Sequence, residues 1–219
     1  MAKRGPAASA RRDEYRAIMR RAILDVARKA IETDGVANLS LRAVARDLGY
    51  SPAALYEYFP DRLAICRALF LEGAQAFFDY ERAALDELPV TATAVDRLRA
   101  LGHAYRRCAL EHPDQFRLIF EARTAGFVPS ESEMAVLNLS GDLLRQVLTD
   151  GVADGSFQQR PVDDMCTLAW STVHGYVLLE LGDLLACGRD AMSAEARNAE
   201  RLAMFDAVLD LLGGAIRAP

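Results

Sequence analysis

Two short stretches of helical sequence, joined by a turn that contains a glycine, constrain the fold of this chain more than any other feature. Residues 40–48 begin with a hydroxyl cap at Ser40, and residues 51–59 begin with Ser51 and Pro52, which are favoured at the first positions of a helix. Gly49 lies between the two stretches and can end a helix in the left-handed conformation. Helices this short are marginal alone, so they must pack on a larger element.

A longer amphipathic helix precedes this pair and supplies that element. It is expected to end at Asp34-Gly35, and basic residues lie between its apolar positions. The apolar face with three-and-four spacing comprises Tyr15, Ile18, Met19, Ala22, Ile23, Val26, Ala27 and Ala30. One long helix followed by two short ones is the pattern of a helix-turn-helix, whose last member lies in the major groove of DNA.

The spacing within the pair separates inward from outward side chains. Leu55 and Phe59 are expected to close the core, and Ala45 is expected to be small because the two helices cross closely there. Tyr56 and Tyr58 project from the outer side, where a phenol can donate a hydrogen bond to a phosphate. The tyrosines therefore favour contact with DNA.

Six further periodic segments follow, separated by proline and glycine. They span residues 61–85, 92–111, 113–121, 130–154, 162–188 and 193–218. The chain is 52% hydrophobic and rich in Ala, Leu, Arg and Glu, whereas extended runs of Val, Ile and Thr are scarce. These features predict an all-α protein of about nine helices.

Charge is divided unevenly along the chain. Residues 1–71 contain 13 Lys and Arg against 8 Asp and Glu, whereas residues 72–219 contain 13 against 23. A basic segment attached to an acidic remainder is typical of a phosphate-binding module joined to a separate body, although helix faces can produce the same division by accident.

Several classes of protein find no support in the residues. The four cysteines are far apart and lack metal-ligand spacing, so we expect reduced, mostly buried thiols, no metal and no cofactor. No long apolar segment and no signal peptide is present, which predicts a soluble, cytoplasmic protein without a membrane partner. The three histidines lie beside no nucleophile and no catalytic motif appears, which argues against an enzyme. The cysteines are Cys66, Cys108, Cys166 and Cys187.

The stretch LSLRAVARDLGYSPAALYEYFPDRLAICRALF, residues 39–70, resembles the DNA-binding domain of TetR-family transcriptional regulators. Arg62 stands where that family usually has lysine, which keeps the positive charge but changes its geometry. The residues themselves predict a flexible basic arm over residues 1–12. The resemblance implies a helix-turn-helix domain over residues 13–62, and an effector-binding and dimerisation domain over residues 63–219.

By the same resemblance, one set of residues contacts an operator in double-stranded DNA. Arg42 and the start of the third helix face the bases, and the other members hold the backbone. Since a proline and two alanines offer no side-chain hydrogen bond, Arg42 is the plausible reader of guanine and DNA shape is expected to contribute to specificity. The set comprises Ser40, Arg42, Ser51, Pro52, Ala53, Ala54, Tyr56, Tyr58 and Arg62.

The stretch LAWSTVHGYVLLELG, residues 168–182, resembles a Trp-x-x-x-His-Gly segment found in one group of TetR-type C-terminal domains. Trp170 and His174 are four residues apart and are expected to share a helix face. Gly175 weakens the helix unless something packs closely against it, so we expect a ligand or a second subunit there.

The last two helices carry broad apolar stripes. In the resembled family such helices form a four-helix dimer bundle, and a two-fold protein suits a palindromic operator. The alternative is a core within one chain. The residues of the stripes are Leu168, Val173, Tyr176, Leu179, Leu184, Leu202, Phe205, Val208, Leu209, Leu212 and Ile216.

The middle helices, by resemblance, enclose a cavity for a small, largely apolar effector that releases the protein from DNA. A ligand-responsive repressor is therefore the expected function. The alternative is a helical protein that binds small molecules and has no DNA activity. The expected pocket residues are Phe78, His103, Tyr105, Phe116, Phe120, Trp170 and His174.

Overall fold

The computed structural model describes residues 6–121, 126–185 and 193–218, and within these ranges the chain is helical without a strand. Nine α-helices and one short 3-10 helix follow in order. They are α1 (Pro6–Asp34), η1 (Val36–Asn38), α2 (Leu41–Asp47), α3 (Pro52–Tyr56), α4 (Arg62–Asp86), α5 (Ala94–Glu111), α6 (Pro113–Glu121), α7 (Glu131–Ala153), α8 (Val162–Leu181) and α9 (Ala194–Ile216). The all-α prediction is confirmed. The chain divides into two compact units, residues 1–73 with 113–134, and residues 74–112 with 135–219.

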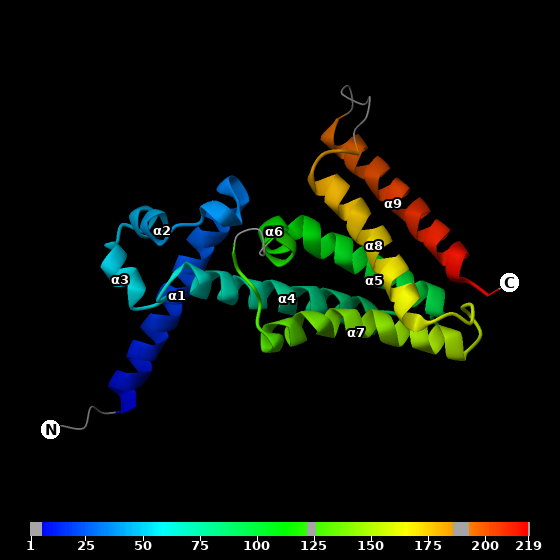
Figure 1. Cartoon of the computed structure of the whole chain (residues 1–219), viewed down its shortest axis with the longest axis horizontal. Coiled ribbons are helices and arrows are strands. Elements are labelled where there is room, and N and C mark those ends of the chain that lie inside the picture. Colours follow the sequence, from blue (N-terminus) through cyan, green and yellow to red (C-terminus); the bar gives the residue numbers. More distant parts are fainter. Residues whose placement is uncertain (1–5, 122–125, 186–192, 219) are drawn as a thin grey trace. The chain divides into compact units, whose positions relative to one another are not determined.

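In the first unit, α1 packs against η1, α2 and α6, while α2 packs against α3 (Figure 1). Ala45 is fully buried and Leu55 and Phe59 are each 1% exposed, so the predicted close crossing of the two short helices is confirmed. The Arg117 guanidinium of α6 donates a hydrogen bond to the backbone oxygen of Glu32 at 3.0 Å, which ties α6 to the end of α1. The helix-turn-helix pair is thus fixed to one long supporting helix.

The N-terminal half of α1 differs from the prediction. Residues 6–12, expected in a flexible arm, lie in α1. Tyr15 and Ile18 were assigned to the buried face, but they are 54% and 59% exposed. The first buried residue of α1 among those described is Met19, because the helices that pack against α1 cover its later turns.

The chain between α1 and α4 contains two further differences. Gly35 has φ of 81° and ends α1 as predicted, but the 3-10 helix Val36–Asn38 that follows it was not expected. The third helix ends at Tyr56, before the predicted Phe59-Pro60 end. A helix of five residues leaves the following tyrosine and phenylalanine in a turn, where their backbone oxygens are accessible to other elements.

In the second unit, α5 packs against both α8 and α9, and α8 and α9 lie side by side (Figure 1). One apolar cluster joins α5, α7, α8 and α9 around Phe157, which follows α7 and is 1% exposed. Phe157 forms an isolated bridge with Arg217 at the end of α9. The residues that follow α9, Arg217 and Ala218, are therefore held against the loop between α7 and α8.

The predicted apolar stripes of α8 and α9 prove to be two different faces. Most of the stripe residues are buried inside the unit, so only the exposed members are available for a dimer interface, which stays a prediction. The buried members are Val173, Tyr176, Phe205, Leu209, Leu212 and Ile216. The exposed members are Leu168, Leu179, Leu184 and Leu202, with exposed fractions of 38%, 44%, 63% and 42%.

The contact between Gly151 and Phe157 gives a direct test of this core. A Cβ atom on Gly151 would lie 2.2 and 2.4 Å from ring carbons of Phe157 and 2.9 Å from the Cβ of Ala94. We expect Gly151→Ala to lower the free energy of unfolding by about 1–3 kcal/mol or more, measured by urea denaturation, because the ring must move out of a packed site. Gly141→Ala, in the same helix with open space around it, should instead stabilise by up to about 1 kcal/mol. Equal effects of the two changes would contradict this packing.

Within the described ranges, no helix is long and apolar enough to cross a membrane. Cys66 and Cys108 are buried free thiols and Cys166 is a half-buried one, as predicted. Burial raises the pKa of the Cys108 thiol to about 12, so it is unreactive at neutral pH. Cys187 lies outside the described residues.

Candidate functional site

The helix expected to face DNA bases begins with a well-formed cap. Ser51 Oγ accepts a hydrogen bond from the backbone N–H of Ala54 at 3.3 Å, and Pro52 occupies the first turn of α3. Pro52 and Ala53 are exposed and Ala54 is half-buried, whereas Leu55 on the opposite side is buried. The expected reading end therefore faces outward.

The start of α2 lies on the exposed side as well. Arg42 and Ser40 are both exposed, as the expected contact with DNA requires. Ser40 occupies the N-cap position of α2, but its hydroxyl makes no cap hydrogen bond, so the predicted capping role of this side chain is wrong. An extended backbone conformation at Ser40 starts the helix without it.

The two outward tyrosines differ in exposure. Tyr56 is 52% exposed, whereas Tyr58 is half-buried. The guanidinium of Arg16 lies 5.7 Å from the centre of the Tyr58 ring, a distance at which the cation and the ring attract each other. Tyr56 is the freer of the two hydroxyl groups to meet a phosphate.

Two arginines of α1 hold the turn that follows α3, and the sequence did not reveal this role. Arg16 donates to the backbone oxygen of Glu57 at 2.8 Å, and Arg20 donates to that of Tyr58 at 2.6 Å. Arg20 also stacks 4.1 Å above the Phe59 ring centre. The four-residue spacing of the arginines was the available signal, but it also fits an ordinary solvated helix face.

A second tyrosine pair lies beside the turn between α2 and α3. Tyr50, which is 43% exposed, forms a hydrogen bond with the Tyr15 hydroxyl of α1, and this bond raises the pKa of Tyr15. Tyr15 was expected in the core, so its place on this surface was missed. Exposed phenols from α1 and from the α2–α3 turn therefore lie together.

Arg62, the first residue of α4, is anchored within the unit. Its Nη1 donates to the backbone oxygen of Val36 at 3.2 Å, and the side chain is half-buried. The guanidinium thus joins the start of α4 to η1. The guanidinium also places a positive charge next to the helix-turn-helix pair.

In the second unit, three of the expected pocket residues come together. The Tyr105 hydroxyl lies 2.8 Å from Nδ1 of His174, and the rings of Trp170 and His174 are 5.4 Å apart, so the expected shared face is confirmed. Phe77 packs against Tyr105 at 5.0 Å. Burial raises the pKa of Tyr105 and lowers the pKa of His174, which keeps both rings uncharged at neutral pH.

The remaining expected pocket residues lie elsewhere. His103 faces α9, where its Nε2 is 3.0 Å from a carboxylate oxygen of Asp206. Phe116 and Phe120 pack against each other at 4.8 Å within the first unit. Phe78 is half-buried on α4. Tyr105, Trp170 and His174 thus lie together in the second unit, whereas Phe116 and Phe120 of α6 lie in the first unit.

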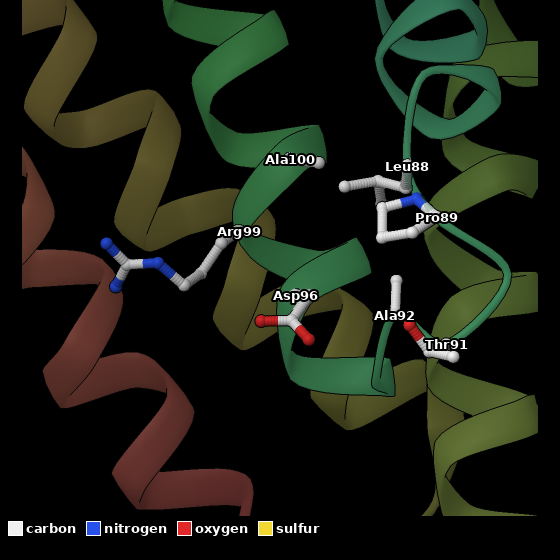
Figure 2. Close-up of a pocket in the computed structure, with 7 residues that line it drawn as sticks. All are labelled: Leu88, Pro89, Thr91, Ala92, Asp96, Arg99 and Ala100. Carbon is white, nitrogen blue, oxygen red and sulfur yellow. The ribbon is translucent and has the colours of Figure 1, made fainter.

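A surface depression of about 370 Å³ lies where the chain passes from α4 to α5 (Figure 2). None of its residues was expected to bind a ligand. Two of its polar side chains are already engaged, since Asp96 forms a capping box with Thr93 and Arg99 binds Asp206 at 2.8 Å. The depression is lined by Leu88, Pro89, Thr91, Ala92, Asp96, Arg99 and Ala100.

The space beside Gly175 is open among the described residues. Apart from its chain neighbours and the backbone of its own helix, no atom lies within 4 Å of the position a Cβ would take at this glycine. No other part of the described chain therefore fills this space. The two expected occupants, a ligand and a second subunit, both stay predictions.

Comparison with known protein families decides the identity of the chain. Residues 23–69 match the family model of tetR-family bacterial regulatory proteins, and residues 98–212 match that of the tetracyclin repressor-like C-terminal domain. The second match alone covers more than half of the 219 residues. The chain belongs to the TetR family. The TetR match begins within α1 and includes α2, α3 and Arg62, and the C-terminal match includes Trp170 and His174.

Known relatives agree with membership of the TetR family. The HTH-type transcriptional regulator Rv1816 of Mycobacterium tuberculosis is 26% identical over 161 residues, which are 73% of this chain and 68% of that protein. A protein of unknown function from Rhodococcus sp. RHA1 has a similar structure, with 26% identity, a TM-score of 0.73 and coverage of 90% of this chain and 95% of the other. A TetR family transcription regulator of Marinobacter aquaeolei VT8 shares the fold at 20% identity, with a TM-score of 0.67 and coverage of 96% and 100%. The chain is therefore a DNA-binding transcriptional regulator and not an enzyme.

Proposed function

We propose that this TetR-family regulator is a cytoplasmic homodimeric repressor that leaves a palindromic operator when a small, largely apolar effector binds. The observation that supports this most strongly is the arrangement of α2 and α3. Their expected DNA-facing residues are exposed or half-buried, while Val44, Ala45 and Leu55 on the opposite side are buried and α2 packs on α1. Residues 13–62 would serve as the DNA-binding domain and residues 63–219 as the effector and dimerisation domain.

The exposed side of α2 and α3 would contact both the bases and the phosphate backbone of DNA. Arg42 would read guanine in the major groove, and Pro52 to Ala54 would contact thymine methyl groups. Ser40, Ser51, Tyr56, Tyr58 and Arg62 would hold the phosphate backbone. Only one of the base-facing residues can form side-chain hydrogen bonds, so part of the specificity would come from the shape of the operator.

The dimer would form through the last two helices. Four exposed residues on one face of α9 recur at the spacing of adjacent helical turns. Exposed apolar residues also form a face along α8. Two glycines on these faces, Gly175 and Gly214, have open space beside them, as close packing with another subunit requires. The exposed residues of the α9 face are Met204, Ala207, Leu211 and Gly214, and those of α8 include Leu168, Leu178 and Leu179.

The dimer can be tested at Leu211, which is 75% exposed. We expect Leu211→Glu to give a monomer in sedimentation and to weaken operator binding on the order of 100-fold. The reason is that the two DNA-binding domains of a dimer bind both half-sites together, whereas a monomer binds only one. Leu139→Glu, at a 39% exposed position on α7, is the matched control and should leave both properties unchanged. A Leu211→Glu protein that remains dimeric would refute the proposed interface.

Release from DNA would follow from differential affinity. In one conformation of the dimer, the spacing of the two DNA-binding domains would not match the operator. An effector that binds this conformation more tightly shifts the population away from the operator-bound conformation. The ring cluster of Tyr105, Trp170 and His174 would supply part of the effector site. Titration of a protein–operator complex with candidate effectors, followed by fluorescence anisotropy, tests this role.

A further inference from the structure

The buried glutamates of the described chain differ in whether a cation is paired with them. Glu133 is paired with Arg67 at 2.7 Å, and Glu180 is paired with Arg106 at 2.5 Å. Glu81 is equally buried, at 6% exposure, yet among the described residues its carboxyl receives only a hydrogen bond from the hydroxyl of Ser140. Among the described residues, this buried carboxyl therefore has no cation paired with it.

This environment makes the charged form of Glu81 unfavourable. Burial raises the pKa of Glu81 to about 8, and the hydrogen bond from Ser140 opposes that rise only in part. An uncompensated carboxylate in an apolar interior is costly, whereas the same carboxylate next to a cation can be favourable. At neutral pH the group is therefore protonated until a cation arrives.

Aromatic rings and a buried thiol lie near Glu81, and Glu111 and Arg107 are the charged groups that act on the same thiol. Glu81 lies one helical turn after Phe77, whose ring packs against Tyr105, and it is close enough to raise the pKa of both Tyr105 and Cys108. Ser140 of α7 covers it from another side. Aromatic faces attract cations, so a carboxyl beside aromatic rings is suited to an organic ammonium ion.

The ring cluster extends from this interior toward the surface. Tyr105 is 7% exposed and contacts His174, whereas Trp170, the next ring, is 48% exposed. The indole of Trp170 also hydrogen-bonds Tyr105. A ligand with a charged end and an apolar body would therefore meet rings along its length and the carboxyl at its buried end.

We propose that the effector of this regulator carries a basic nitrogen attached to an apolar body, and that Glu81 is the counter-ion of that nitrogen. This inference rests on the proposed effector-binding function and narrows its ligand class. The ammonium keeps its proton, and the carboxyl of Glu81 releases its own proton to solvent as the ion pair forms. Binding near neutral pH is therefore accompanied by the release of up to one proton.

A series of probes tests the proposal on the full chain. The ω-phenylalkylamines with two to five methylenes, each compared with the alcohol of the same length, are titrated by calorimetry at pH 7 in phosphate and in Tris. We expect the best amine to bind about tenfold or more tightly than its alcohol, with proton release revealed by the difference between buffers. Glu81→Gln should abolish both the preference and the proton release, and Glu87→Gln at an exposed position should retain them.

The outcomes separate this inference from the proposed function. Equal binding of amines and alcohols, no binding by any amine, or an unchanged preference in Glu81→Gln would overturn the role of Glu81. If a neutral compound still releases the operator in that case, the repressor proposal survives alone. If an amine binds through Glu81 but leaves operator binding intact, the site stands and its regulatory role is refuted.

Discussion

Replacing Glu180 with alanine is expected to lower the free energy of unfolding by about 3–5 kcal/mol. Arg106 donates two hydrogen bonds of 2.7 and 2.5 Å to this carboxylate, and the two side chains are 11% and 2% exposed. Removing the acid leaves the Arg106 guanidinium buried without its counter-ion. Urea denaturation at a fixed protein concentration measures the loss.

A double replacement distinguishes the cost of an unpaired buried charge from the cost of lost side-chain packing. Arg106→Met combined with Glu180→Met removes both charges and keeps most of the volume, so its stability should be close to that of the original protein. Arg82→Ala, which breaks an exposed pair with Asp86 on α4, should change stability by less than about 1 kcal/mol. A double variant as unstable as Glu180→Ala would show that packing and not charge dominates at this site.

The second large effect concerns pH and Glu81. The pKa of this carboxyl rises from its ordinary 4.5 to about 8 on folding. Between these values the native protein holds a proton that the unfolded chain has lost, so stability falls as pH rises through this window. The loss is complete above about pH 8 and is on the order of 5 kcal/mol.

Glu81→Gln should remove this dependence. The variant is expected to match the original protein below pH 4.5 and to exceed its stability by a few kcal/mol above pH 8. The difference between the two pH profiles isolates the contribution of Glu81 from other titrating groups. Glu87→Gln, at an exposed position, should follow the original profile. Parallel profiles for the original protein and Glu81→Gln would contradict the burial of an unpaired carboxyl.

The helical architecture could be predicted because its signals are local. Gly35 ends α1, Ser51 caps α3 and prolines separate the later helices, and each of these residues acts within one or two turns of its own position. The exposed reading end of α3 and the buried Leu55 followed from helical spacing alone. The family resemblance of residues 39–70 was confirmed by the matching family model.

Tertiary contacts explain what the sequence could not predict. Periodicity marks an apolar face but does not say whether the same chain or another covers it, so buried Val173 and exposed Leu179 were placed in one stripe. Arg16 and Arg20 bind backbone oxygens of a turn about 40 residues away, and no local pattern specifies that contact. Glu81 looks like an ordinary surface residue until α5 and α7 cover it.

The individual DNA contacts and the Trp-x-x-x-His-Gly subgroup stay predictions. The structure places the expected contact residues on an accessible surface, but a hydrogen bond to a phosphate depends on a partner molecule. Tyr56 is well exposed, whereas Tyr58 and Arg62 also serve the fold through contacts with Arg16 and Val36. Substitutions at Tyr58 or Arg62 would therefore mix loss of DNA contact with loss of packing.

Operator binding as a function of salt tests the central claim most directly. A palindromic duplex selected from random sequence is titrated with the full chain between 50 and 200 mM salt, together with Arg42→Ala and Arg82→Ala. We predict that the logarithm of the binding constant falls linearly with the logarithm of the salt concentration, by about 0.9 for each phosphate contacted. Arg42→Ala should weaken specific binding by about 1–3 kcal/mol, while Arg82→Ala should not. Affinity that is independent of salt and of Arg42 would contradict a regulator that grips DNA through α2 and α3.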